Sequence, residues 1–127
     1  MNLMDAIERN VFLEKVFPEG IADTLEIRQL CLEKSGRTTI RILVKQKPAI
    51  DVKKWGEWNK DFDTLGVVLT GSSIHDVEIE NWEGSGPSSL NISKKDDLFC
   101  FLQEGNDWKI SFSCDSFIFE EIVTGLE

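Results

Sequence analysis

The sequence contains few of the residues on which metal sites and many enzyme sites depend. It has one histidine, His75, and three cysteines without close spacing, Cys31, Cys100 and Cys114. A zinc site needs several such ligands together, and a Ser-His-Asp triad needs a histidine beside its nucleophile. We therefore predict no metal and no cofactor, and we interpret His75 as an exposed or hydrogen-bonded histidine. Each cysteine lies in an apolar run, which predicts buried, reduced thiols.

The sequence also lacks a long hydrophobic run. The longest uninterrupted apolar stretch has five residues, from Leu98 to Leu102. A membrane helix needs about 20 such residues, and the core of a signal peptide needs about 7 to 15. We therefore expect no membrane span, no export and a cytoplasmic location.

Basic residues are scarce in the second half of the chain. Residues 1–60 contain 11 Lys or Arg and 9 Asp or Glu, whereas residues 61–127 contain 3 and 14, for a net charge of −9 overall. A surface this acidic repels phosphate backbones, so we expect no nucleic acid partner. It attracts a basic protein and speeds the encounter. Solubility alone is the alternative explanation for the acidic charge.

Apolar and polar residues alternate with a period of two from Thr24 onward, and turn residues recur every eight to twelve positions. This pattern predicts eight strands, at residues 25–33, 38–45, 64–70, 74–82, 89–93, 98–103, 108–114 and 117–123. Two of them contain consecutive apolar residues, which predicts that both of their faces are covered. We expect one domain over residues 1–127, mainly β, with an antiparallel eight-stranded sandwich or barrel-like sheet and a short N-terminal helix at residues 3–9.

The phase of the pattern makes further predictions inside two strands. The apolar residues change parity at Arg28 and Gln29, which predicts a β-bulge there. In the strand at residues 74–82, Val77 and Ile79 are predicted to face the core, and the acids between them are predicted to face solvent.

Two pairs of acids are candidates for acid–base chemistry. Asp61 and Asp63 precede one strand, and Glu78 and Glu80 share a face of another. Two carboxylates held roughly 5 to 10 Å apart in a cleft are the machinery of glycoside hydrolysis, which makes a carbohydrate-active enzyme an alternative function. Acids that alternate with apolar residues also describe an exposed strand face. We adopt this second interpretation and assign no catalytic residue.

Two of the four tryptophans, Trp55 and Trp58, lie in the polar segment KPAIDVKKWGEWNK at residues 47–60. Trp108 has the phase of a core residue. We predict that Trp55 folds inward as a plug of the sheet and that Trp58 points outward. Trp82 follows an acidic strand and is either a core-edge or a binding residue. Exposed tryptophans concentrate binding energy in interfaces, roughly 2 kcal/mol or more each.

Several short features follow one another between Pro48 and Val123. They are Pro48, the pair Lys54-Trp55, Asn59 before the strand TLGVVLTG, an acidic strand ending at Trp82, the triplet FSC at residues 112–114, and a last apolar strand with Ile122. In this order they resemble the Immunity protein 50 family. The resemblance implies a small bacterial protein of a polymorphic toxin system, which protects the producing cell by binding the toxin domain encoded beside it. It implies no catalytic residues, and it gives Pro48, Trp55 and Asn59 a role in supporting their loop.

The leading hypothesis is a protein that binds and occludes a basic effector domain. Trp58 and Trp82 are the predicted anchors of this interface. The full set of predicted partner-binding residues is Trp58, Asp61, Asp63, Glu78, Glu80, Trp82 and Glu83. A β-barrel carrier of a small ligand is an alternative, because eight strands can close around a cavity. The carrier predicts an enclosed apolar cavity with an open mouth, and the enzyme predicts two carboxylates that converge in a cleft.

Overall fold

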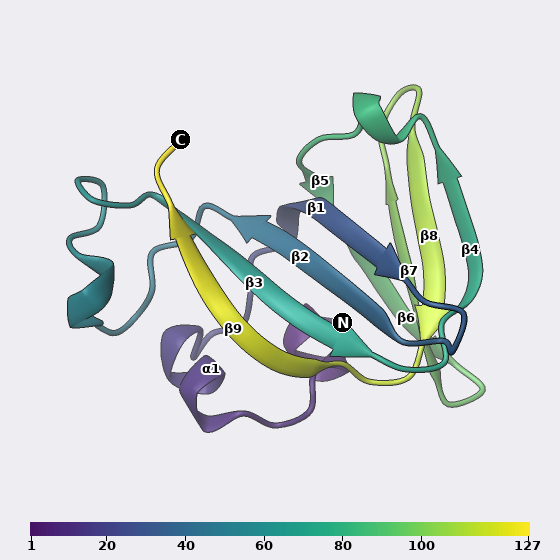
Figure 1. Cartoon of the computed structure of the whole chain (residues 1–127), viewed down its shortest axis with the longest axis horizontal. Helices are drawn as coiled ribbons and strands as arrows, with labels where there is room; N and C mark the ends of the chain where they lie inside the picture. Colours follow the sequence, from purple (N-terminus) through teal and green to yellow (C-terminus); the bar gives the residue numbers. More distant parts are fainter.

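The computed structural model describes residues 1–127 and contains nine strands in two antiparallel sheets (Figure 1). The five-stranded sheet has the order β5-β1-β2-β3-β9, with β1 at Thr24–Leu32, β2 at Thr38–Val44, β3 at Thr64–Gly71, β5 at Ser88–Ser89 and β9 at Ile118–Gly125. The four-stranded sheet has the order β4-β8-β7-β6, with β4 at His75–Glu80, β6 at Asn91–Lys95, β7 at Leu98–Glu104 and β8 at Lys109–Cys114. The predicted antiparallel β fold is confirmed. The two sheets do not close into a barrel.

The ninth strand arises because the predicted strand at residues 89–93 is divided between the sheets. β5 pairs with the start of β1, where Ser88 lies opposite Leu25. β6 pairs with β7 instead. Leu90, between the two strands, is buried, and its N–H donates to the carbonyl of Asp23 at 3.0 Å. The prediction of one continuous strand was therefore wrong, because the chain crosses from one sheet to the other at Leu90.

The N-terminal segment contains two short helices. The predicted helix at residues 3–9 is a single 3-10 turn, η1 at Leu3–Ala6, and an α-helix that we did not predict, α1, follows at Val11–Val16. The side chain of Asn10 accepts a hydrogen bond from the Leu13 N–H at 3.0 Å and so caps α1. Asn10 before an apolar run was the sequence signal for this helix.

One hydrophobic core joins both sheets and the N-terminal segment. It contains 25 buried side chains, contributed by the inner faces of both sheets, by η1 and α1, and by the loop between β2 and β3. Figure 1 shows the four-stranded sheet across one end of the five-stranded sheet, with α1 near β9. The ring of Phe12 in α1 lies 6.2 Å from that of Phe119 in β9. The N-terminal helices thus cover the part of the five-stranded sheet that the other sheet leaves open.

A buried polar side chain links the two sheets. Gln103 of β7 is fully buried, and its Nε2 donates hydrogen bonds to the carbonyls of Leu25 at 2.7 Å and Ser88 at 2.9 Å. The first acceptor lies in β1 and the second in β5. The Oε1 atom of Gln103 has no hydrogen-bond partner. One side chain therefore holds β7 against the edge of the five-stranded sheet.

Both strands singled out by phase are irregular. The bulge predicted at Arg28 and Gln29 is confirmed, since the pairing of β1 with β2 shifts register there. β4 contains a second bulge, at the left-handed Asp76 (φ 52°). Ile79 pairs with the buried Ile110 and so lies on the inner face as predicted, yet it is 40% exposed. Its exposure arises because β4 is an edge strand of the four-stranded sheet.

The tryptophans in the core follow the predictions more closely than the cysteines do. Trp108 is buried, and Trp55 is 8% exposed and packs edge-on against Phe62, so it is the predicted plug. Of the cysteines, Cys114 is buried and Cys100 is half-buried. Cys31 is exposed, which corrects our prediction. It lies after the bulge in β1, opposite Thr39 on the outer face of the five-stranded sheet.

Candidate partner-binding face

The predicted partner-binding residues form two separate groups (Figure 1). The first group is in the loop between β2 and β3 and consists of Trp58, Asp61 and Asp63. The second group is on and after β4 and consists of Glu78, Glu80, Trp82 and Glu83, the last two in the 3-10 turn η3 at Trp82–Gly84. Figure 1 places the loop at one end of the long axis and β4 at the other, with the green turn that follows β4 at the top of the view. No single surface contains all seven residues.

The polar side chains of the first group hold the loop together. Asp61 accepts a hydrogen bond from the Glu57 N–H at 2.7 Å, and Asp63 accepts one from the Glu127 N–H at 2.8 Å. Trp58 is half-buried and packs edge-on against Phe62, with ring centroids 5.4 Å apart. These contacts give the three residues a structural role, and their predicted binding role stays a prediction.

The second group lies beside a charged pair. Lys109 of β8 donates a hydrogen bond to Glu78 at 2.9 Å. This contact raises the pKa of Lys109. Glu80 lies directly opposite Lys109 in the sheet and is exposed. The half-buried Trp82 and the exposed Glu83 line a separate shallow depression with residues of β1.

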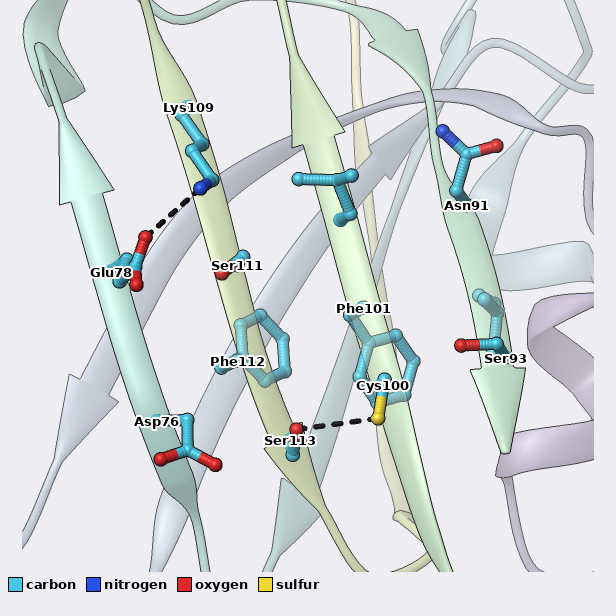
Figure 2. Close-up of a pocket in the computed structure, with 12 residues that line it drawn as sticks. Asp76, Glu78, Asn91, Ser93, Cys100, Phe101, Lys109, Ser111, Phe112 and Ser113 are labelled. Carbon is cyan, nitrogen blue, oxygen red and sulfur yellow. Dashed lines mark hydrogen bonds and ion pairs between the residues drawn. The ribbon is translucent and has the colours of Figure 1, made fainter. Parts of the chain in front are cut away.

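Next to Glu78 the outer face of the four-stranded sheet is hollowed (Figure 2). Most outward side chains in the middle of this sheet are small, namely Ser111 and Ser113 on β8, Cys100 on β7 and Ser93 on β6. Leu102 on β7, opposite Ser111, is the larger exception. Exposed positions of central strands are usually occupied by β-branched or aromatic residues. Small side chains leave an open depression of about 430 Å³, which we call the serine trough. It is lined by Asp76, Glu78, Asn91, Ile92, Ser93, Cys100, Phe101, Leu102, Lys109, Ser111, Phe112 and Ser113.

The floor of the trough is formed by the two central strands, which pack against the core. Phe101 and Phe112 belong to the same two central strands, are buried on the inner face, and stack with ring centroids 5.0 Å apart. Directly above them, Ser113 and Cys100 lie opposite each other and are joined by a weak hydrogen bond of 3.5 Å. The trough therefore lies directly over packed core side chains.

Most polar groups of the trough have no partner within the chain. The Lys109–Glu78 pair and the Ser113–Cys100 contact are the interactions among its side chains. By contrast, the side chains of four other lining residues make no hydrogen bond and no ion pair, namely Asp76, Asn91, Ser93 and Ser111. Their hydrogen-bonding capacity is available to an incoming molecule.

The geometry can be compared with what the two alternative functions predict. A carrier was expected to be a barrel around an enclosed cavity, whereas the sheets are not closed and the trough is open on the surface. An enzyme was expected to bring two carboxylates together in a cleft. Of the predicted pair, Glu78 lines the trough and Glu80 does not, and Asp76 is the second carboxylate of the trough. His75 is exposed and does not line the trough. No group of three or more His, Cys, Asp or Glu side chains is placed to hold a metal ion.

A comparison with protein families matches residues 13–125 to Immunity protein 50. The chain belongs to the Immunity protein 50 family. This result confirms the resemblance between Pro48 and Val123 and extends it back to α1. For an Immunity protein 50 member, the family name supports a role in immunity and implies a protein toxin as the partner.

Other comparisons add little to the family assignment. Neither the curated proteins nor the solved structures gave a match. None of the helices is long and apolar enough to cross a membrane.

Sequence reasoning found only one wall of the trough in this Immunity protein 50 member. Glu78 was among the predicted residues, whereas Asp76 and the serines were not. A signal was present in the segment Lys109–Cys114, KISFSC, where small polar residues alternate with buried apolar ones. The small size of these serines predicts a hollow only when the strand order is known, because that order places Cys100 and Ser93 beside them.

Proposed function

We propose that this protein neutralises a toxin by binding its effector domain and covering the active surface. Membership of the Immunity protein 50 family is the observation that carries the proposal. The unpartnered polar face of the four-stranded sheet supports it, because a binding protein needs an accessible surface with free hydrogen-bonding groups.

The charge distribution favours a basic effector. Residues 61–127 contain 14 acidic and 3 basic residues, and this half of the chain includes the whole four-stranded sheet. Effectors that attack nucleic acids have basic substrate surfaces, so an acidic face attracts them and imitates the charge of their substrate. Such steering raises the association rate and weakens as salt screens it. Nucleic acid itself is repelled.

Neutralisation of this kind requires no turnover by the immunity protein. It is sufficient that the lifetime of the complex exceeds the time for which the cell must be protected. This lifetime is set mainly by the dissociation rate. The bacterial cytoplasm is the compartment that we propose for this encounter. The three unpaired cysteines fit a reducing environment.

Co-purification with the product of the adjacent gene tests the proposal. The tagged chain is co-expressed with that product, and cell survival and complex formation are measured with and without the chain. We expect survival and a stable complex. A toxic product that the chain neither binds nor neutralises would refute the proposed function.

Charge reversal tests which face is used. The double variant Glu78→Lys/Glu80→Lys is expected to slow association about tenfold at low salt and to flatten its salt dependence. The matched control, Glu14→Lys/Glu19→Lys, changes the net charge equally but lies in and just after α1, outside both groups of predicted binding residues. If both variants slow association equally, net charge alone matters and β4 has no special role.

A further inference from the structure

The serine trough differs from the outer face of the other sheet. There the central strands carry large outward side chains, including Arg41 and Leu43 on β2 and Val68 on β3. The side chain of Arg41 even lies over Gly66, where an added Cβ would come within 3.1 Å of its Nε. The five-stranded sheet thus fills its own surface. The four-stranded sheet leaves its centre open.

The wall of the trough formed by β4 has an excess of negative charge. Lys109 is paired with Glu78 and has two more acids as neighbours, Glu80 opposite it on β4 and Glu104 opposite it on β7. Asp76 has no ion pair. Lys109 therefore has three carboxylates around it, and Asp76 adds an unpaired fourth at the other end of β4. An additional cation would be attracted to this wall. Lys95 is at the far end of β6, away from β4 in the sheet order.

The backbone of Asp76 is held in an unusual conformation. Its φ of 52° is in the left-handed region, which few residues other than glycine, asparagine and aspartate adopt readily. The conformation belongs to the bulge that shifts the register of β4 against β8. Figure 2 shows the resulting position of the Asp76 carboxylate, beside Ser113 at the end of the trough away from Lys109. Bulges of this kind re-aim a side chain.

We propose that the serine trough receives a protruding segment of the toxin domain, with one arginine or lysine side chain seated over Ser111 and Ser113 against Asp76. The inference rests on the proposed function and identifies the chemistry of its contact. Neighbouring strands are about 5 Å apart, so a cation over the two serines is close to both Asp76 and Glu78. The hydroxyls of Ser93 and Ser111 and the amide of Asn91 then bind the backbone of the segment.

Shape and charge make separate contributions, and separate variants test them. Ser111→Phe fills the trough without changing the charge, and Thr39→Phe is the matched control on the outer face of the five-stranded sheet. Asp76→Asn removes the charge and keeps a residue that tolerates the left-handed backbone. Asp96→Asn is its matched control, because Asp96 is exposed, has a φ of 51° and lies in the turn between β6 and β7.

The measurement is the dissociation constant for the toxin domain that co-purifies with the chain, obtained by titration calorimetry. We expect Ser111→Phe to weaken binding at least 100-fold and Asp76→Asn to weaken it 5- to 50-fold, with both controls within twofold of wild type. Circular dichroism verifies folding. If Ser111→Phe does not fold, Asp76→Asn and its control decide the question alone.

A double-mutant cycle identifies the cation. Each arginine and lysine of the toxin domain is replaced by alanine and measured against wild type and Asp76→Asn. We expect one toxin residue to show at least fivefold coupling with Asp76. If wild type binds the toxin but the trough variants bind equally well, or if no basic toxin residue couples to Asp76, the trough is not the contact and the proposed function still stands. If wild type does not bind, the proposed function fails as well.

Discussion

Replacing Gln103 by glutamate tests how the two sheets are joined. Gln103 is fully buried and donates two hydrogen bonds, to the carbonyls of Leu25 and Ser88. A carboxylate at this site has no proton to donate and faces two carbonyl oxygens. The protonated acid still donates one hydrogen bond. Burial therefore raises the pKa of the introduced carboxyl well above its ordinary value of about 4.3.

The sign and size of the effect follow from proton linkage. The folded variant keeps the proton on the introduced carboxyl while the unfolded chain loses it above pH about 4.3, so the free energy of unfolding falls as the pH rises. Each pH unit costs about 1.36 kcal/mol. Between pH 5.5 and pH 7.5 the variant should lose about 2.7 kcal/mol relative to wild type, in addition to about 1 kcal/mol for the missing hydrogen bond.

Urea unfolding followed by tryptophan fluorescence measures these free energies. Gln103→Met is the control, because it has a similar length and no polar atom. We expect it to lose about 2 kcal/mol for the two hydrogen bonds at either pH. If Gln103→Glu loses less than about 1 kcal/mol between the two pH values, the carboxyl is solvated and a buried link between the sheets is refuted.

Three further predictions concern residues of the core and the loop. Burial raises the pKa of the Cys114 thiol to about 12. Alkylation at pH 8, followed by mass spectrometry, should therefore modify the exposed Cys31 rapidly and Cys114 only on unfolding. Equal alkylation rates at the two cysteines would contradict this prediction. Because the unfolded thiol loses its proton near pH 9 while the folded one keeps it, the unfolding free energy should fall between pH 9 and about 12 in wild type more than in Cys114→Ala. In urea unfolding, Trp55→Ala should destabilise the protein by about 3 kcal/mol and Trp58→Ala by about 1 kcal/mol, because only Trp55 is fully packed. Equal losses of unfolding free energy would mean that Trp55 does not plug the sheet.

The strands were predictable because their alternation is local. Each predicted range overlaps an observed strand, since a strand with one buried face needs apolar residues at every second position. Leu90 shows the limit of this argument. It belongs to a run that is regular in sequence, and its transfer between sheets depends on pairing of Ser88 and Ser89 with Thr24 and Leu25, which are far away in the sequence.

The N-terminal helices show a different limit. Leu3, Met4 and Ile7 have helical spacing, yet the turn ends at Ala6, and the N–H of Phe117 donates to the Ala6 carbonyl. The neighbouring Ile7 forms a parallel bridge with Phe117. A tertiary contact thus overrides a weak local preference.

For the candidate site, the sequence indicated the kind of chemistry but not its arrangement. Asp61 and Asp63 looked like surface acids, and the structure uses them to bind backbone N–H groups, one of them at Glu127. Glu78 was correctly expected on an exposed face. The hollow beside it depends on which strands are neighbours, and alternation within a single strand does not reveal that order.

The crossing of the chain at Leu90 affects how the molecule unfolds. β5 and β6 are adjacent in sequence but belong to different sheets, and Gln103 fastens the same corner. Separation of the four-stranded sheet from the other sheet would also break the pairing of Ser88 and Ser89 with β1. We therefore expect both sheets to melt in one cooperative transition, without a half-melted intermediate. A nascent chain would then acquire its trough only when the entire β framework is complete.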